Sequence, residues 1–245
     1  MIELNTFSIA ARCKRTGMLG VAVSTAVPAV GAICPFVEAG VGAIATQSWV
    51  NPYLGIDGLA LLREGLSAPE ALAKLLAEDS GREVRQIGVV DAQGRTAVHT
   101  GADCVDWAGH IEADNFTVQG NMLVGAATID AMAEAAARSE ALPLYERLML
   151  VLEAGQAVGG DKRGKQSASL KIFKTEAYAY LDLRVDEHRN PVAELRRVLE
   201  VAKHQLLPFI DGMPSRADPI GGLPEEVTAM LMTPPPYRPG GNGGA

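Results

Sequence analysis

The stretch that decides the fold is the first hairpin of the chain, Asn5-Thr6-Phe7-Ser8-Ile9-Ala10-Ala11 followed by Leu19-Gly20-Val21-Ala22-Val23-Ser24. Thr16-Gly17 supplies the turn between two apolar runs, so the pattern predicts paired strands at residues 5–13 and 18–25. Thr6 stands at the head of the first strand, where we expect the sheet to open into a cleft. Cleavage before such a threonine leaves one residue that carries both a hydroxyl nucleophile and an amine base.

The rest of the chain continues in blocks of strands and helices. The patterns predict strands at 32–37 and 42–49, helices at 55–65 and 68–79, strands at 86–90, 96–100, 107–111 and 116–119, helices at 127–138 and 143–156, strands at 167–173 and 178–185, and a last helix from Asn190-Pro191. The first four strands are small and apolar on both faces, which is typical of strands covered on both sides. We therefore expect an α+β fold, a four-layer αββα sandwich of two mostly antiparallel sheets.

Length and composition indicate an ordinary globular protein with one large domain. The chain has 245 residues, of which 48% are hydrophobic and 21% charged, and its formal charge is -7. We expect one domain at residues 1–207 and a Pro/Gly-rich C-terminal arm at 208–245, which carries a short helix at 225–232. An acidic chain lacks the positive surface that nucleic-acid binding needs, so we expect no nucleic-acid partner.

Cysteine spacing and hydropathy narrow the expected location. Cys13, Cys34 and Cys104 are odd in number and widely spaced, without a CxxC motif, so neither a disulfide framework nor a zinc site is indicated. The four histidines show neither HxH nor HExxH spacing, and we expect no metal and no cofactor. No basic leader and no long apolar run occur, so we expect a cytoplasmic protein without a membrane partner.

Short motifs at turns and strand ends are spread over about residues 5–200. They include Thr6-Phe7-Ser8-Ile9, Ala45-Thr46-Gln47, Asn51-Pro52, Gln86-Ile87-Gly88, His99-Thr100-Gly101, Trp107-Ala108-Gly109, Gln119-Gly120-Asn121, Gly159-Gly160-Asp161 and Asp182-Leu183-Arg184. In these motifs the chain resembles the family catalogued as domain of unknown function 1028, which is grouped with the N-terminal-nucleophile (Ntn) hydrolases. The resemblance implies the αββα fold and places Thr6 where Ntn hydrolases keep their catalytic hydroxyl. A fold does not by itself determine a reaction.

Thr6 and Ser24 form the first catalytic hypothesis. Ser24 ends the second strand near the position where proteasome β-subunits place an aspartate that orients the nucleophile. The lysine that those enzymes carry some thirty residues after the threonine has no counterpart, and Glu38 lies in its neighbourhood. A proteasome-like protease is therefore disfavoured, since that lysine assists proton transfer. Release of Thr6 as an N-terminus requires cleavage between Asn5 and Thr6.

Three further residues are candidates for the chemistry. Gln119 and Asn121 flank a glycine at a strand end, where neutral amides can donate to a developing oxyanion; ordinary turn chemistry is the alternative. His99 precedes Thr100-Gly101 and is the best candidate for a base, with a structural histidine as the alternative.

The loop at 159–167 is the candidate substrate-binding segment, contributing Asp161, Lys162, Arg163, Gln166 and Ser167. It resembles a phosphate-binding loop, yet it joins a helix to a strand and has glutamine at the magnesium-binding hydroxyl position, so nucleotide binding is not indicated. The loop either caps the preceding helix or forms a basic lip that recruits a carboxylate. Arg184 could join it, or could instead pair with its neighbours Asp182 and Asp186.

These observations lead to three hypotheses about function. The first is a hydrolase of a small amide, ureide or acyl-amino compound with a hydroxyl nucleophile. The second is a non-catalytic Ntn-like module that binds a small anionic metabolite through Lys162, Arg163 and Arg184. The third is a structural subunit of a homo-oligomer. We expect a small-molecule substrate, which is anionic in the second hypothesis. We also expect self-association, helped by the C-terminal arm.

Overall fold

The computed structural model describes residues 6–105, 107–159 and 164–233 of the chain. The chain divides into two compact units, with the boundary between Arg196 and Arg197, and each unit is described by itself. Asp161, Lys162 and Arg163 of the predicted substrate loop lie outside the described residues.

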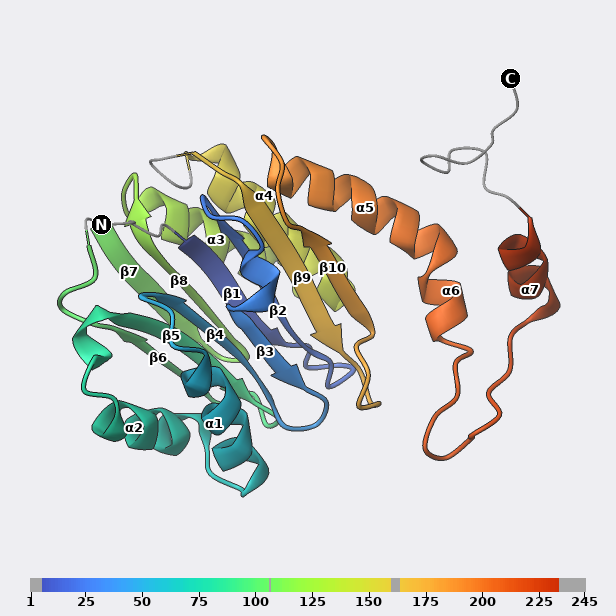
Figure 1. The fold of residues 1–245 in the computed structure, drawn as a ribbon, viewed down its shortest axis with the longest axis horizontal. Coiled ribbons are helices and arrows are strands. Elements are labelled where there is room, and N and C mark those ends of the chain that lie inside the picture. The colour runs from blue at the N-terminus through green and yellow to red at the C-terminus, as the bar shows by residue number, and fades with distance from the viewer. Residues whose placement is uncertain (1–5, 106, 160–163, 234–245) are drawn as a thin grey trace. The chain divides into compact units, whose positions relative to one another are not determined.

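Two antiparallel sheets form the centre of the first unit (Figure 1). The larger sheet has the order β10-β9-β2-β1-β8-β7 and consists of β1 (Thr6–Arg12), β2 (Leu19–Thr25), β7 (Trp107–Ala113), β8 (Phe116–Leu123), β9 (Ser167–Phe173) and β10 (Leu181–Val185). The smaller sheet has the order β3-β4-β5-β6 and consists of β3 (Pro35–Glu38), β4 (Gly42–Ser48), β5 (Arg85–Asp91) and β6 (Thr96–Thr100). β1 therefore lies in the interior of its sheet, between β2 and β8.

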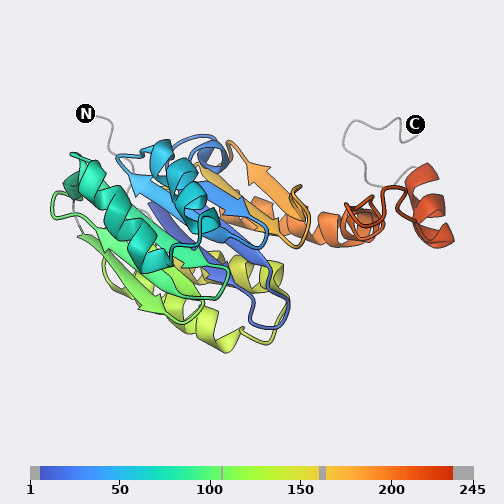
Figure 2. The same cartoon turned by 90° about the horizontal axis from the view of Figure 1, so that it is seen from below.

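Helices cover the outer face of each sheet. The pair α1 (Pro52–Arg63) and α2 (Ala68–Glu78) packs on the four-stranded sheet, and the pair α3 (Ala127–Arg138) and α4 (Leu144–Ala157) packs on the six-stranded sheet. Figure 2 shows these layers, with the teal helices on one side of the two sheets and the yellow-green helices on the other. The predicted four-layer αββα sandwich is confirmed.

Alternation along the strands explains how the layers separate. Ala10, Val21, Ala43, Ala45 and Val90 are all fully buried in one cluster between the two sheets. Small side chains let the sheets approach closely, because successive side chains of a strand point to opposite faces and only one face meets the other sheet.

The other face of the smaller sheet meets helices. Ile44 and Ile87 alternate with the inward-facing residues and pack with Leu54, Leu61 and Leu72 of α1 and α2. β4 and β5 thus carry buried apolar residues on both faces, as expected for strands covered on both sides.

The structure differs from several of the predicted element boundaries. β8 continues to Leu123, four residues beyond its predicted end at 119. α1 starts at Pro52, three residues before the predicted start, because the Asn51 side chain accepts a hydrogen bond from the Tyr53 N–H and caps the helix. α2 ends at Glu78, one residue before the predicted end, because Asp79 has an extended backbone. The Asp79 side chain accepts a hydrogen bond from the Gly81 N–H. The strand predicted at 32–37 is shorter, since a 3-10 turn occupies Val30–Ala32. The strand predicted from 178 begins at Leu181.

The C-terminal part of the described chain is helical. α5 (Pro191–Gln205) begins in the first unit, and the second unit includes α6 (Leu207–Ile210) and α7 (Glu225–Met232). The short helix predicted at 225–232 is confirmed. Among the helices of the described residues, none has the length and apolar character required to cross a membrane.

Candidate functional site

The ends of four neighbouring strands lie together at one end of the six-stranded sheet, which we call the Thr6 end. Thr6 begins β1 and is paired with Thr25 at the end of β2 on one side and with Asn121 near the end of β8 on the other. Ser167 begins β9 and is paired with Thr25. The antiparallel register thus brings together residues that are far apart in the sequence.

Hydrogen bonds hold Thr6 in place at this end of the sheet. Its side chain faces the other sheet, as Ser8 does, and the residue is only 4% exposed. The Thr6 Oγ1 lies 3.1 Å from the Thr25 Oγ1, so one hydroxyl donates to the other. The Thr6 carbonyl oxygen accepts from Gln47 Nε2 of the facing sheet at 3.4 Å. The hydroxyl of Thr6 is therefore positioned by neutral groups.

Gln86 is the centre of a buried amide network that joins the sheets. Its Oε1 accepts from Gln47 Nε2 at 2.7 Å and from Asn121 Nδ2 at 3.0 Å. Its Nε2 donates to the carbonyl oxygens of Gly120 at 2.9 Å and Gly109 at 3.1 Å. Gln47 and Gln86 are completely buried, and Asn121 is nearly so. Buried amides with several partners fix one arrangement of the strands.

A second branch of the network runs along β1 and β8. Ser8 Oγ donates to Gln47 Oε1 at 2.6 Å and accepts from Gln119 Nε2 at 2.7 Å. Three buried oxygens on β8 have no hydrogen-bond partner among the described residues: Thr117 Oγ1, Gln119 Oε1 and Asn121 Oδ1. Native proteins rarely leave buried polar atoms unpaired, so these three oxygens distinguish β8 from an ordinary strand.

The network reaches the surface at His110. Gln86 Nε2 donates to Thr100 Oγ1 at 2.8 Å, and Thr100 Oγ1 lies 2.8 Å from His110 Nδ1. Desolvation of the ring lowers the pKa of His110, and the Glu112 carboxylate opposes this shift only partly. The lowered pKa favours the neutral ring, and one hydrogen bond joins its Nδ1 to the Thr100 hydroxyl.

Ser24 does not contact Thr6. Its side chain is one position along β2 from that of Thr25 and points to the opposite face, where its hydroxyl lies 3.4 Å from the Ser167 carbonyl oxygen. Thr25 takes the place that we expected for Ser24. Strand alternation provides the signal that identifies it, because Thr6 and Thr25 are directly opposed in the hairpin register.

His99 is also separate from Thr6. Its Nε2 lies 2.9 Å from the Arg82 carbonyl oxygen, and it shares a face of β6 with Ala97, which packs against α2 and its neighbours. The contacts of His99 are therefore those of a structural histidine, which is the alternative given from the sequence. His110 is the histidine joined to the amide network.

The described residues of the predicted substrate loop have structural contacts. Ser167 is completely buried, donates to the Val27 carbonyl oxygen at 2.6 Å and accepts from the Val30 N–H at 3.1 Å. The Gln166 N–H donates to the Thr25 carbonyl oxygen at 2.8 Å, which extends the pairing of β2 and β9. These contacts place the start of β9 at the Thr6 end of the sheet.

Arg184 is paired within its own strand end. Its guanidinium lies 3.1 Å from Asp186 Oδ1, while Asp182 pairs across the sheet with Lys171 at 3.4 Å. Ion pairing of these residues, the alternative weighed from the sequence, is what the structure shows. Within the described ranges, no three His, Cys, Asp or Glu side chains are grouped to hold a metal ion.

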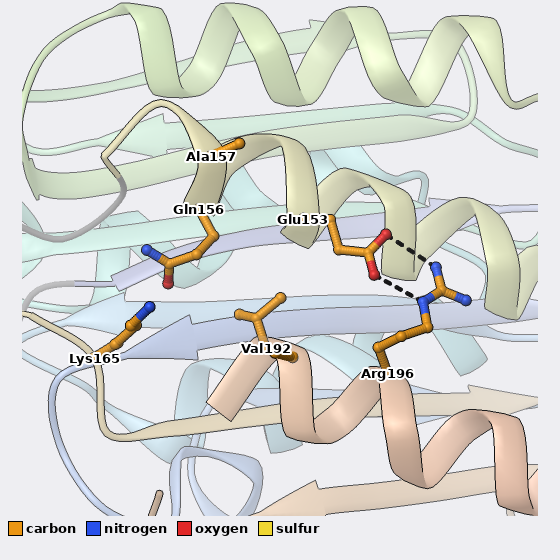
Figure 3. Close-up of a pocket in the computed structure, with 7 residues that line it drawn as sticks. Glu153, Gln156, Ala157, Lys165, Val192 and Arg196 are labelled. Atoms are coloured by element: carbon orange, nitrogen blue, oxygen red, sulfur yellow. Dashed lines mark hydrogen bonds and ion pairs between the residues drawn. The ribbon is translucent and has the colours of Figure 1, made fainter. Parts of the chain in front are cut away.

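Two cavities lie against α4. One of about 320 Å³ lies between α4, the segment before β9 and the start of α5 (Figure 3). The other, of about 590 Å³, is lined by residues of α3, α4 and the loop between them. Neither is lined by Thr6, so the cleft expected at the head of β1 is not one of these two cavities.

Comparison with family models confirms the family that the sequence motifs indicate. A family model described as "Family of unknown function (DUF1028)" matches residues 6–195. The crystal structure of protein SPO2555 from Silicibacter pomeroyi, assigned to the same family model, is similar with a TM-score of 0.82 and 28% identity, covering 90% of this chain and 100% of that one. Anbu (ancestral beta-subunit) from Yersinia bercovieri has a TM-score of 0.39 and 11% identity, covering 80% and 94%. No curated protein matches the chain.

Proposed function

Because this chain belongs to the family of unknown function DUF1028, we propose its activity from the geometry of its own residues. The proposal is a hydrolase that cleaves a C–N bond of a small amide, ureide or acyl-amino compound, with the Thr6 hydroxyl as nucleophile. The observation that carries it is the position of Thr6, which heads an interior strand and has its Oγ1 3.1 Å from the Thr25 Oγ1.

The reaction needs the free α-amine that cleavage before Thr6 produces. The amine accepts the hydroxyl proton while Oγ1 attacks the substrate carbonyl and forms a C–O bond. The C–N bond then breaks, and the leaving nitrogen receives the proton from the α-ammonium. Water, deprotonated by the same amine, hydrolyses the resulting ester and restores the Thr6 hydroxyl.

Asn121 supports this proposal. It lies opposite Thr6 in the register, and its buried Oδ1 has no partner among the described residues. A free α-amine at Thr6 has additional N–H groups, and in our proposal one of them donates to this oxygen. Gln119 and Asn121 already donate from their amide nitrogens to Ser8 and Gln86. In our proposal they therefore position the first strand, in place of the oxyanion role expected from the sequence.

The test combines intact mass with two substitutions. We expect the active protein to have a mass that lacks residues 1–5, and Thr6→Ala to lose about a thousandfold in turnover of a panel of small amides, ureides and N-acyl amino acids. Thr6→Ser keeps a hydroxyl and is expected to retain activity. Full activity in Thr6→Ala, or activity in a protein whose mass still includes residues 1–5, contradicts the mechanism.

A non-catalytic binding role is the second candidate. It is favoured by the 4% exposure of Thr6, because a substrate carbonyl must reach its hydroxyl. In that case no member of the panel is turned over, and mass spectrometry finds the chain intact before Thr6.

A further inference from the structure

The cavity between α4 and α5 has the dimensions and lining of a small-molecule site. Its volume of about 320 Å³ falls at the lower end of the range for ligand pockets. The lining includes Glu153, Gln156, Lys165, Val192, Ala193 and Arg196. All of them belong to the first unit, and three segments that are distant in the sequence supply them (Figure 3).

Gln156 gives the cavity an unused acceptor. Its Oε1 is buried and has no hydrogen-bond partner among the described residues. Figure 3 shows the side chain directed toward the space beside Lys165. A buried amide oxygen without a donor is unfavourable unless an occupant of the cavity supplies an N–H.

Lys165 gives the cavity a positive group. The side chain is half-buried, and its ammonium has no ion pair with a described residue. A positive group on the wall of a cavity attracts the carboxylate of an anionic ligand.

The acidic group of the cavity is already paired. Glu153 binds Arg196 through both carboxylate oxygens, at 2.7 and 3.0 Å, and Arg196 also donates to Glu146 at 2.6 Å. Figure 3 shows this pair at the end of the cavity away from Lys165. The pairing fixes the wall between α4 and α5. Among the described polar residues that line the cavity, Lys165 and Gln156 are then the groups that a ligand can use.

We propose that this cavity binds a small carboxylate that carries an amide N–H, of which an N-acyl amino acid is the simplest form. The carboxylate binds Lys165, the N–H donates to Gln156 Oε1, and the apolar part contacts Val192 and Ala193. The site is separate from the Thr6 hydroxyl, because α4 covers the outer face of the six-stranded sheet and Thr6 points to the inner face. Binding therefore does not require that Thr6 be catalytic.

The test measures binding of N-acetyl-L-alanine by calorimetry, with acetate and N-methylacetamide as partial ligands. We expect Lys165→Met to raise the dissociation constant by about tenfold or more, and Gln156→Met by about fivefold. Gln156→Met removes an unpaired buried oxygen, so its melting temperature should equal or exceed that of the parent. Lys74→Met, on the opposite outer layer, is the matched control and leaves the affinity unchanged.

Three results would overturn the proposal. One is that N-acetyl-L-alanine does not bind at its highest soluble concentration. Another is that the parent and both cavity variants bind it equally. The third is that acetate binds as tightly as N-acetyl-L-alanine, which leaves Gln156 without a role. Thr6→Ala separates this proposal from the hydrolase: it abolishes turnover if the hydrolase proposal is correct and leaves cavity binding unchanged.

Discussion

Replacing Gln86 by methionine tests whether the buried amide network holds the two sheets together. Methionine keeps the length of the side chain and removes both polar atoms. The change takes the Gln86 partner from five groups. The Thr100 hydroxyl keeps its contact with His110, so four groups are counted: the amide nitrogens of Gln47 and Asn121 and the carbonyl oxygens of Gly109 and Gly120. At about 1 kcal/mol for each group, the free energy of unfolding should fall by about 4 kcal/mol.

Gln119→Met is the matched control, because it changes the same residue type in the same buried layer. Gln119 donates to Ser8 and its Oε1 has no described partner, so we expect a loss of only about 1 kcal/mol. Both variants are compared with the parent by urea unfolding at pH 7, followed by far-ultraviolet circular dichroism, with equal slopes against urea required. If Gln86→Met loses no more stability than Gln119→Met, the network does not join the sheets energetically.

Three further substitutions test other parts of the fold. His110 has a lowered pKa in the folded state, so the stability that it contributes is present above its ordinary pKa of 6.5 and is lost as the pH falls below it; melting curves between pH 5 and 8 should show a shallower loss for His110→Gln than for the parent. Ser67→Ala removes a capping box that Glu70 completes, and should lower the free energy of unfolding by about 1 kcal/mol in urea titrations; an unchanged midpoint contradicts the cap. Gly55→Ala should destabilise by about 1–3 kcal/mol although alanine favours helices, because its Cβ would overlap the Phe36 ring; a raised melting temperature would show that the ring moves freely.

The fold could be predicted because its signals are local. Ser67 caps α2 within three residues, and alternation in each strand repeats every two residues, so neighbouring side chains carry the information. The order of the blocks then leaves few ways to cover both faces of each sheet. The boundary errors occurred where local signals compete, as at Asn51-Pro52, which ends one element and starts the next.

The candidate site could be predicted only in part. Thr6 was identified because a threonine at the head of a strand has a recognisable chemical use. Gln47 and Gln86 were not identified as site residues, since glutamine at the end of an apolar strand resembles ordinary strand-end polarity. Their importance depends on partners 14 to 41 residues away in the sequence.

Sequence alone therefore determined the elements of this protein, their order and the threonine at the head of an interior strand. Tertiary structure decided which hydroxyl lies beside Thr6, because the hairpin register selects Thr25 and directs Ser24 to the opposite face. It also decided which polar atoms are buried without a partner in the part of the chain that the structure describes, such as Gln156 Oε1. Hydrogen bonds act over about 3 Å, and folding alone determines which distant residues come that close.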